Sequence, residues 1–376
     1  MKKGVILLGG HIQGLNIVRI YGKKGIPVIL IDRDEFNLAK HSKYCKKFYK
    51  SSDFLQLFLD FELQDRYRGW FIIPTSDLQV KILSQNRERL NSHFIVSTDK
   101  WSVVEKCYNK IETYKIAKRL SIPIPWTLFP KDKEELSNST IEYPCIIKPA
   151  VMHIFYSKFK KKVFVCRDRD ELLANYSLAT QVIPKSEIIV QEIIEGDSHN
   201  QYSACFYYNR DRSYIHIVAR RKRQHPVDFG NATTFAQTVQ IPELKDDAEK
   251  ILKEIEYSGL CEVEFKYDAK DNRYKLLEIN PRTWKWHSIS QKAQTPFLIS
   301  IYEKMVNSRD IIVDSYKESY FKHLLLDTIM LILNRKYRET STTPTKDMTQ
   351  YAVWDREDIT PAIWELIYFP YNLIKR

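Results

Sequence analysis

The hydrophobic positions change their spacing along the chain, and the first stretch contains short, wholly apolar runs. Residues 4–8 form one such run and residues 28–31 form another, with a helical pattern over 15–24 between them. Apolar runs that alternate with helical segments are typical of buried parallel strands. A further strand pattern at 70–74, followed by a helix, continues this order. The pattern therefore predicts an α/β domain with a parallel sheet over residues 1–100.

The middle of the chain has a period of two instead. Strand patterns at 143–150 and 187–190 precede two pairs of alternating segments, at 202–221 and 263–280, and each pair is interrupted by a polar turn. Alternation on both sides of a short turn is typical of antiparallel hairpins. A helix over 110–120 joins this part to the first domain. We therefore expect α+β structure after the first domain.

The last part of the chain, residues 311–376, is predicted to be a helical extension. Its final helix places Trp364, Ile367, Tyr368 and Tyr371 on one face. We expect this face to dock on the body of the protein, and peripheral contact with an anionic membrane surface is the alternative. No transmembrane segment is predicted, because no stretch approaches the roughly 20 apolar residues of a membrane span.

The composition indicates a cytosolic protein with an excess of positive charge. The chain has 376 residues, with 59 Lys and Arg against 47 Asp and Glu, a net charge of +12. This length predicts two or three domains. Such a charge attracts polyanions such as nucleotides, nucleic acid, anionic lipid or phosphate-bearing precursors. The alternative is that the charged residues only form solvated surfaces. Six cysteines without a CxxC pair, and an N-terminal apolar run too short for a signal peptide, predict reduced thiols and a cytoplasmic location.

Four consecutive basic residues run from Arg220 to Arg223. Such a cluster could bind nucleic acid. On a strand, however, Arg221 and Arg223 face one way while Arg220 and Lys222 face the other, so only half of the cluster can face one cleft. We therefore expect no nucleic-acid partner, and we expect these cations to bind a triphosphate or a substrate carboxylate.

The hairpin over 263–280 carries acids that oppose each other. If it folds about Asp271, Glu264 lies across from Glu278, and Asn280 lies on the same face. Opposed carboxylates destabilise a sheet unless a cation lies between them. Two carboxylates and an amide oxygen suit Mg²⁺ or Mn²⁺ bound together with phosphates. The alternative is an exposed hairpin whose acids face water.

Two basic side chains extend this interpretation. Arg282 follows directly after the second strand of the hairpin, where a guanidinium could bind a transferring phosphate. Lys148 lies near the end of an apolar strand, and a lysine there needs an anionic partner because burial disfavours its charge. A nucleotide phosphate is a natural partner. The alternative is a lysine that reaches solvent from an edge strand.

The first domain also contains a glycine-rich turn that resembles a dinucleotide site only weakly. Gly9, Gly10 and Gly14 surround the first strand-to-helix turn, and Asp32 ends the second strand. The dinucleotide motif has the spacing GxGxxG, whereas this chain has GGxxxG. NAD binding is therefore a minor alternative.

The local sequence of the metal-binding hairpin carries a resemblance to a known family. Glu-Phe-Lys at 264–266 and Glu-Ile-Asn-Pro-Arg at 278–282 resemble the metal-binding signature of the ATP-grasp superfamily. The chain is most similar to the carboxylate–amine ligases of the group that contains D-aspartate ligase. The further stretches that carry this similarity are 25–32, 74–77, 223–226 and 354–358.

The resemblance implies a domain order. It implies a Rossmann-like pre-ATP-grasp domain over 1–100, a small ATP-grasp lobe with a linker helix over 101–198, a large lobe with the metal site over 199–310, and a helical tail over 311–376. The small lobe of the family carries a glycine-rich flap over the phosphates. The corresponding stretch here, 151–162, has no glycine, so we expect aromatic and lysine side chains to cover the site.

The resemblance also implies residue roles. The phosphates of ATP would be bound by Lys110 and Lys148, its adenine by Gln191, the Glu192 carbonyl and the Ile194 amide, and its ribose by Asp197 or Glu195. The metal would be bound by Glu264, Glu278 and Asn280, with Arg282 and Lys222 as the catalytic cations. The substrate would be contacted by Arg223, Trp284, Trp286 and His287, of which His287 could act as a base and either tryptophan could instead be core packing.

The implied reaction is the ATP-dependent joining of a small-molecule carboxylate, expected to be an amino acid, to an amine acceptor. The carboxylate attacks the γ-phosphate, which gives an acyl phosphate and ADP, and the amine then displaces phosphate. An acceptor on a cell-wall or surface-polysaccharide precursor fits the positive charge. A nucleotide-binding relative without ligase activity is the alternative, and an oligomer is possible.

Overall fold

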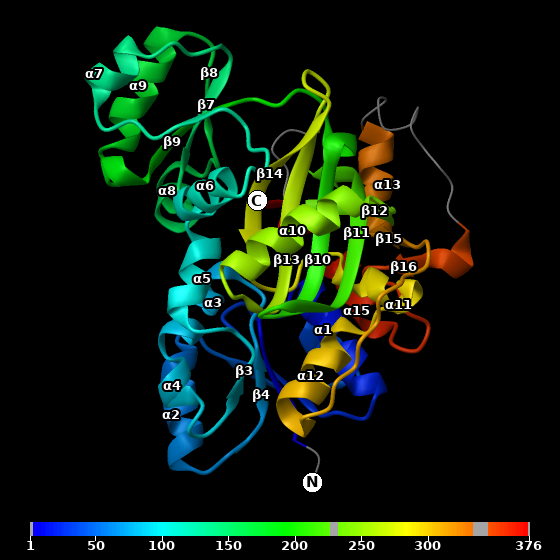
Figure 1. Cartoon of the computed structure of the whole chain (residues 1–376). Coiled ribbons are helices and arrows are strands. Elements are labelled where there is room, and N and C mark those ends of the chain that lie inside the picture. Colours follow the sequence, from blue (N-terminus) through cyan, green and yellow to red (C-terminus); the bar gives the residue numbers. More distant parts are fainter. Residues whose placement is uncertain (1–2, 226–231, 334–344, 375–376) are drawn as a thin grey trace.

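The computed structural model describes residues 3–225, 232–333 and 345–374, which form three sheets (Figure 1). The first sheet has parallel strands in the order β3-β2-β1-β4-β5, which confirms the parallel sheet predicted for the start of the chain. Its elements are β1 (Val5–Leu8), α1 (Ile12–Lys23), β2 (Val28–Asp32), η1 (Ala39–His41), β3 (Cys45–Lys50), α2 (Phe54–Leu63), β4 (Phe71–Ile73), α3 (Asp77–Gln85), α4 (Arg87–Leu90) and β5 (Ile95–Val96).

Strand β1 is apolar throughout because both faces of this sheet are covered. Val5 and Leu7 pack into one core, which includes helix α1, and Ile6 and Leu8 pack into a second core on the opposite face. Helix α3 begins directly after β4, where Ser76 caps it. The same edge of the sheet therefore presents loops and a helix N-terminus toward the rest of the molecule.

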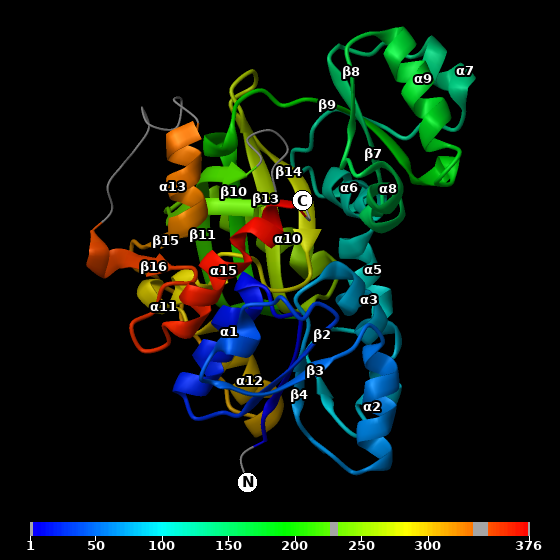
Figure 2. The same cartoon turned by 180° about the vertical axis from the view of Figure 1, so that it is seen from behind.

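A small lobe follows and projects away from the rest of the molecule in both views (Figures 1 and 2). Its four-stranded sheet has the order β6-β9-β7-β8 and its own apolar core. The predicted flap is mostly helix α8. The elements of this part are α5 (Trp101–Tyr108), α6 (Lys110–Arg119), β6 (Thr127–Leu128), α7 (Lys133–Asn138), β7 (Cys145–Pro149), α8 (Met152–Phe159), β8 (Phe164–Cys166), α9 (Arg169–Ala179), η2 (Lys185–Glu187) and β9 (Ile188–Glu192).

The third sheet is the largest, in the order β14-β13-β10-β11-β12-β15-β16. Alternating residues of β10 enter different cores: Cys205 and Tyr207 face the core that contains α1, and Phe206 and Tyr208 face the core under α10. The sheet is thus buried on both faces. Its elements up to β14 are η3 (Ser198–Asn200), β10 (Gln201–Asn209), β11 (Arg212–His225), β12 (Ala232–Thr238), α10 (Pro242–Glu254), β13 (Ser258–Asp268) and β14 (Arg273–Asn280).

The C-terminal part is helical, as predicted, but it also adds two strands to the large sheet. Strand β15 pairs with β12, and β16 pairs with β15. Among the described residues, no helix is long and apolar enough to cross a membrane. The elements of this part are η4 (His287–Ile289), α11 (Ser290–Ala293), α12 (Phe297–Asn307), β15 (Tyr320–Lys322), α13 (Leu324–Leu333), η5 (Lys346–Met348), β16 (Thr349–Tyr351) and α15 (Thr360–Ile374).

Candidate functional site

The β13–β14 hairpin brings its two acids face to face. Glu264 pairs with Glu278, as predicted, and the register changes by one residue immediately beyond this pair. The change places one extra residue, Leu277, on β14, because Phe265 pairs with Leu276. Residues that pair directly across a ladder point to the same side of the sheet, so both carboxylates lie on one face, next to this β-bulge.

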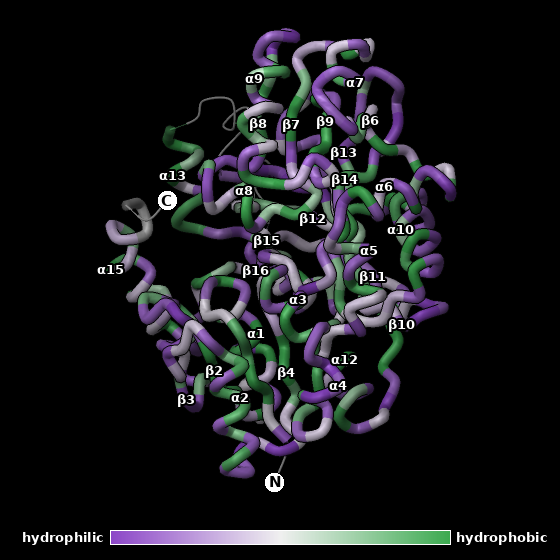
Figure 3. Tube along the Cα trace, turned by 90° about the vertical axis from the view of Figure 1, so that its left-hand side faces the viewer, coloured by the Kyte–Doolittle hydropathy of each residue, from purple (hydrophilic) through white to green (hydrophobic). Residues whose placement is uncertain are grey.

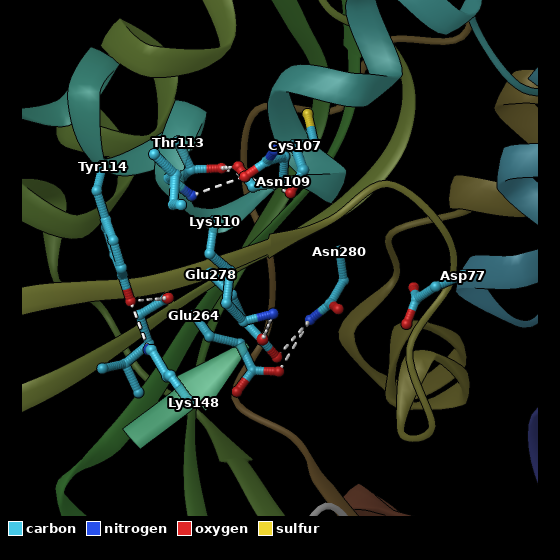
Figure 4. A network of polar contacts seen from close by, with 12 residues as sticks. Asp77, Cys107, Asn109, Lys110, Thr113, Tyr114, Lys148, Glu264, Glu278 and Asn280 are labelled. Carbon is cyan, nitrogen blue, oxygen red and sulfur yellow. Dashed lines mark hydrogen bonds and ion pairs between the residues drawn. The ribbon is translucent and has the colours of Figure 1, made fainter. Parts of the chain in front are cut away.

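The side chains around these acids converge on one point (Figure 4). Asn280 Nδ2 donates to Glu264 Oε1 at 3.0 Å and to Glu278 Oε1 at 3.5 Å. Lys110 Nζ lies 2.8 Å from Glu278 Oε2. Arg221 donates from a guanidinium nitrogen to Glu264 Oε2 at 3.2 Å. The repulsion between the two carboxylates is therefore offset by an amide and two cations.

Lys110 reaches the acids from the N-terminus of α6. Asn109 caps this helix by accepting from the backbone amide of Ile111. The Lys110 amide donates to the carbonyl of Ala150, which follows β7, so the small lobe positions the lysine. Burial lowers the pKa of Lys110, but the nearby acidic groups, above all Glu278, together raise it above its usual value. Burial raises the pKa of Glu278, but the charges of Lys110, Lys162 and Lys148 together outweigh burial and lower it. Both groups are charged at neutral pH.

Lys148 lies on β7, next to this pair, and is almost completely buried. Its ammonium donates to the Tyr114 hydroxyl at 2.8 Å, and that hydroxyl donates to the Leu277 carbonyl at 2.6 Å. Burial, together with the positive charge of Lys110, lowers the pKa of Lys148 to about 7. A buried lysine with a lowered pKa gains charge when an anion binds beside it. The site is therefore suited to an additional negative group.

Two further cations belong to this cluster, and both were expected near the site only as members of a group, Lys162 in the flap and Arg221 in the basic run 220–223. Lys162 follows helix α8, and burial lowers its pKa, while the charges of Glu278 and Glu264 offset part of this lowering. Arg221 holds Glu264, whereas its neighbour Lys222 was predicted to be catalytic. Two features of the sequence indicate these residues. Lys162 stands at the end of the flap, and alternation along a strand points Arg221 to the opposite side from Lys222.

Arg282 connects the hairpin to the first domain. Its Nε donates to Asp77 Oδ1 at 2.6 Å, and a terminal nitrogen donates to Asn280 Oδ1 at 3.2 Å. Asp77 begins helix α3, at the carboxyl edge of the parallel sheet. The arginine predicted to bind phosphate therefore lies beside the predicted metal ligands, and an acid of the first domain fixes its orientation.

The donor set at the hairpin fits a hard divalent cation. No group of three or more His, Cys, Asp and Glu side chains suited to a metal is found within the described part of the chain. The hairpin instead offers two carboxylates and the amide of Asn280. Mg²⁺ uses few protein ligands and keeps water or substrate phosphates as the others. Glu264, Glu278 and Asn280 are thus the residues that would hold it.

The residues predicted to bind adenine and ribose lie where β9 leaves the small lobe. Gln191 is buried, and its Nε2 donates to Thr127 Oγ1 at 2.9 Å. The Glu192 carboxylate accepts from Lys275 Nζ at 2.9 Å, and the Ile194 carbonyl accepts from Lys266 Nζ at 2.6 Å. Both lysines belong to the β13–β14 hairpin. This segment therefore forms a hinge between the two lobes.

Asp197 follows the hinge and was predicted to bind ribose. Its carboxylate accepts from the His199 backbone amide at 2.8 Å and lies 3.1 Å from His199 Nδ1. These contacts cap the short helix η3. The structure thus gives Asp197 a local structural role next to the hinge.

The prediction that Arg223 contacts the substrate is wrong. Arg223 is 2% exposed, and it forms a bidentate ion pair with Asp327 of helix α13 at 2.7 and 2.8 Å. The register of β11 changes between Arg221 and Arg223, which disrupts the regular alternation and separates these two side chains. Lys222 lies at this irregularity. Burial lowers its pKa, and the positive charges of Arg220 and Arg223 lower it further. The structure therefore sets Lys222 beside those arginines.

The residues predicted to line the substrate pocket after the hairpin are also corrected. Trp284 and Trp286 are 1% and 3% exposed, and their rings pack against each other in the core shared by the first and third sheets. His287 Nε2 lies 3.1 Å from the Gln13 carbonyl, and burial lowers the pKa of this histidine to about 4. All three side chains hold the two sheets together, since their burial keeps them from contacting a substrate.

The glycine turn of the first domain donates a backbone hydrogen bond to an acid of the same domain. The Gly10 amide donates to Asp32 Oδ2 at 2.6 Å, so the acid that ends the second strand is bonded to the turn itself. His11, in the same turn, is exposed. The charges that act on its ring come from Asp32, Arg282 and Lys285. The turn therefore lies close to Arg282, and Asp32 and Lys285 are the other charges near it.

Comparison with known proteins agrees with this geometry. Residues 110–307 match the family model of the carbamoyl-phosphate synthase L chain ATP-binding domain, an ATP-grasp family. The match begins at Lys110 and includes every residue of the cluster except Asp77.

The chain is also similar in sequence to curated relatives. D-aspartate ligase of Enterococcus faecium is 29% identical over 233 residues, which are 58% of this chain and 54% of that enzyme. The chain thus matches about half the length of this relative.

Solved structures are similar in fold. The biotin carboxylase domain of the 2-oxoglutarate carboxylase of Hydrogenobacter thermophilus, solved with MgADP and bicarbonate, has a TM-score of 0.68 and 16% identity and covers 85% of this chain and 73% of that chain. N5-carboxyaminoimidazole synthetase of Staphylococcus aureus, complexed with ADP, has a TM-score of 0.64 and 15% identity and covers 93% and 92%. The chain therefore has the predicted ATP-grasp fold.

Proposed function

Because the chain belongs to the ATP-grasp family of the carbamoyl-phosphate synthase L chain ATP-binding domain, we propose that it is an ATP-dependent carboxylate–amine ligase. It forms an acyl phosphate from a carboxylate and ATP, and then an amide from the acyl phosphate and an amine. ADP and phosphate are released. Because the reaction consumes ATP, we propose a cytoplasmic location for the enzyme.

One observation carries this proposal. The opposed acids Glu264 and Glu278 lie among the cations Lys110, Lys148, Lys162, Arg221 and Arg282. In a cluster that only stabilised the fold, each charge would have an opposite charge as its partner, and there would be no surplus charge. Here the cations outnumber the acids, and the hydrogen bond that the Lys148 ammonium donates within the described part of the chain goes to a neutral hydroxyl, that of Tyr114. Such an excess is suited to a triphosphate and a metal ion.

The residues of the chain can perform the phosphoryl transfer by position and charge. Lys110 and Lys148 neutralise the phosphates from the small lobe, and Arg282 stabilises charge on the transferred group from the opposite side. Mg²⁺ held by Glu264, Glu278 and Asn280 would add Lewis-acid stabilisation of the phosphate oxygens. No protein nucleophile is required, because the attacking atom is the substrate carboxylate.

An amino acid is the proposed carboxylate substrate. The name of one relative, D-aspartate ligase, supports this class. The glycine turn supports it as well, since Arg282 and Lys285 can bind carboxylates while Asp32 favours an ammonium group. We propose that the amine acceptor is a cell-wall or surface-polysaccharide precursor, for which the net charge of +12 provides attraction.

A coupled assay of ADP release tests the proposal. Purified protein with Mg-ATP is offered a panel of amino acids together with amine acceptors. We expect at least one pair to stimulate ADP and phosphate release in equal amounts, and we expect a Glu278→Gln variant to abolish it. Glu142→Gln is the matched control, because Glu142 is an exposed acid that pairs with Lys270 on the surface.

Two results would contradict the ligase assignment. Binding of Mg-ATP without ADP release for any pair would favour a nucleotide-binding relative that does not ligate. Equal turnover of the Glu278→Gln and Glu142→Gln variants would remove the proposed role of the hairpin acids.

A further inference from the structure

The last helix of the described chain, α15, leaves one face exposed. Ile363, Leu366 and Ile367 are 51%, 62% and 55% exposed, and Pro370 is also exposed. These four residues have the spacing i, i+3, i+4 and i+7, so they form one continuous line on the helix. We call this line the apolar stripe. It contains no polar side chain.

The opposite face of α15 holds the helix in place. The Trp364 ring stacks on His41 with centroids 4.1 Å apart, and Tyr371 packs on Phe36 at 4.4 Å. Tyr368 is buried, and its hydroxyl lies 2.9 Å from His41 Nε2. The predicted docking of Trp364, Tyr368 and Tyr371 on the body is confirmed, whereas Ile367 lies on the exposed side. The stripe is therefore presented outward by a fixed helix.

A basic segment lies directly beside the docked face. His41, which contacts Trp364, belongs to the sequence that runs from η1 into β3, the edge strand of the first sheet. Lys43, Lys46 and Lys47 in this segment are exposed. We call these three lysines the basic strip. Lys50 also lies on β3, but Glu35 pairs with it at 2.7 Å and offsets its charge.

The helix that carries the stripe, the strand into which the strip runs, and helix α13 lie on the same side of the molecule. In Figure 2, α13, α15 and β3 all face the viewer, and in Figure 3 they follow one another along the left-hand edge. Helix α13 adds the exposed side chains Leu324, Ile332 and Leu333. Apolar and positively charged groups are thus combined on one face.

We propose that this face docks on the surface of an anionic phospholipid bilayer. An amphipathic helix that lies in the bilayer interface inserts its apolar face, and neighbouring lysines bind acidic headgroups. The apolar stripe supplies the first contribution and the basic strip the second. A second copy of this chain fits less well, because a two-fold interface at this face would bring equal positive charges toward each other. The inference is independent of the reaction catalysed.

Vesicle flotation with the full chain tests this inference. The probes are large unilamellar vesicles of pure phosphatidylcholine and of equal parts phosphatidylcholine and phosphatidylglycerol. We expect binding to the anionic vesicles, weaker binding as salt is raised, and little binding to the neutral ones. No binding to the anionic vesicles, or equal binding to both kinds, would overturn the proposal.

Two variants separate the two contributions. Replacing both Leu366 and Ile367 by serine should lower the vesicle partition coefficient on the order of 100-fold, because two inserted side chains are lost. Replacing the three lysines of the basic strip by glutamine should lower it roughly 100-fold on anionic vesicles alone.

Leu178→Ser is the matched control, since Leu178 is 45% exposed on α9 in the distant small lobe. This control should bind like the wild type, and thermal unfolding should show all variants folded, since every changed side chain is exposed or solvated. If the stripe variant floats like the wild type, or if light scattering shows that it converts a dimer to a monomer, the bilayer assignment is wrong.

Discussion

The large sheet carries two buried or half-buried charge clusters that differ in how their charges are balanced. On one side, Arg223 and Asp327 form a closed bidentate pair, with side chains 2% and 0% exposed. On the other, Glu264 and Glu278 are 16% and 31% exposed and lie among an excess of cations. Asp327 also accepts from Thr234 and lies 3.6 Å from Lys322, so its charge is balanced within the protein, whereas the open cluster has more cations than acids. Neighbouring arginines on β11, Arg221 and Arg223, serve the two different clusters.

The strongest test of this difference removes the closed pair. Arg223→Gln leaves the Asp327 carboxylate buried without its guanidinium partner, and loss of one member of a buried ion pair costs roughly 3–5 kcal/mol of stability. We expect the denaturation midpoint to fall, measured by urea unfolding. The folded fraction should retain the wild-type KM for ATP, and a large change in KM at unchanged stability would show that Arg223 belongs to the site.

The matched substitution lies two residues earlier, at Arg221, and should reduce activity more than stability. Arg221→Gln removes the cation that contacts Glu264, and loss of one such electrostatic contact in a site lowers kcat on the order of 100-fold. We expect little change in the free energy of unfolding, because Asn280 still bonds to Glu264. Steady-state kinetics together with urea unfolding would refute this prediction if the variant were active but unstable.

A smaller effect concerns the charge of Lys148. Its pKa is lowered to about 7 by burial and by Lys110, so the free lysine is mostly neutral at about pH 8. Phosphate binding raises this pKa, so ATP binding should take up close to one proton at that pH and weaken as pH rises above 7. Calorimetry in two buffers of different ionisation enthalpy measures the uptake. A Lys148→Met variant with the same uptake would exclude this lysine as the source.

The smallest effect is expected at Lys162. This side chain is half-exposed and acts on Glu278 and Glu264 from the segment after α8. Lys162→Ala should raise the KM for ATP about fivefold, since a partly solvated charge contributes about 1 kcal/mol. Lys161→Ala is the control, because Lys161 is exposed. Equal effects of the two substitutions would show only a loss of general positive charge.

Features that depend on residues close together in the chain could be predicted from the sequence alone. The symmetry of the hairpin about Asp271 predicted that Glu264 faces Glu278, and the apolar context of Lys148 predicted an anionic partner. Apolar runs and alternation likewise predicted the parallel first sheet and the antiparallel hairpins. The position of Arg282 directly after the hairpin placed it at the same site, and the family resemblance at the start of the linker helix added Lys110.

The remaining features depend on contacts that lie far apart in the sequence or on irregular backbone. Asp327 is 104 residues from Arg223, and no local pattern indicates that they pair. The irregularity at Lys222 changed which cation of the basic run reaches the site. Trp284 and Trp286 follow the hairpin motif and were expected to line a pocket, but they fill the core between two sheets, and aromatic residues give the same sequence signal in either role.

We propose that Glu264 and Glu278 hold a divalent cation together with ATP, and calorimetric titration with a non-hydrolysable ATP analogue measures this directly. The titration compares the wild type with a Glu264→Gln/Glu278→Gln double variant, each with Mg²⁺ and with EDTA. In the wild type, Mg²⁺ should strengthen analogue binding about tenfold or more. In the double variant, binding should be the same with Mg²⁺ and with EDTA, because the carboxylate ligands are gone. A double variant that keeps the wild-type dependence on Mg²⁺ would show that these two acids do not hold the cation.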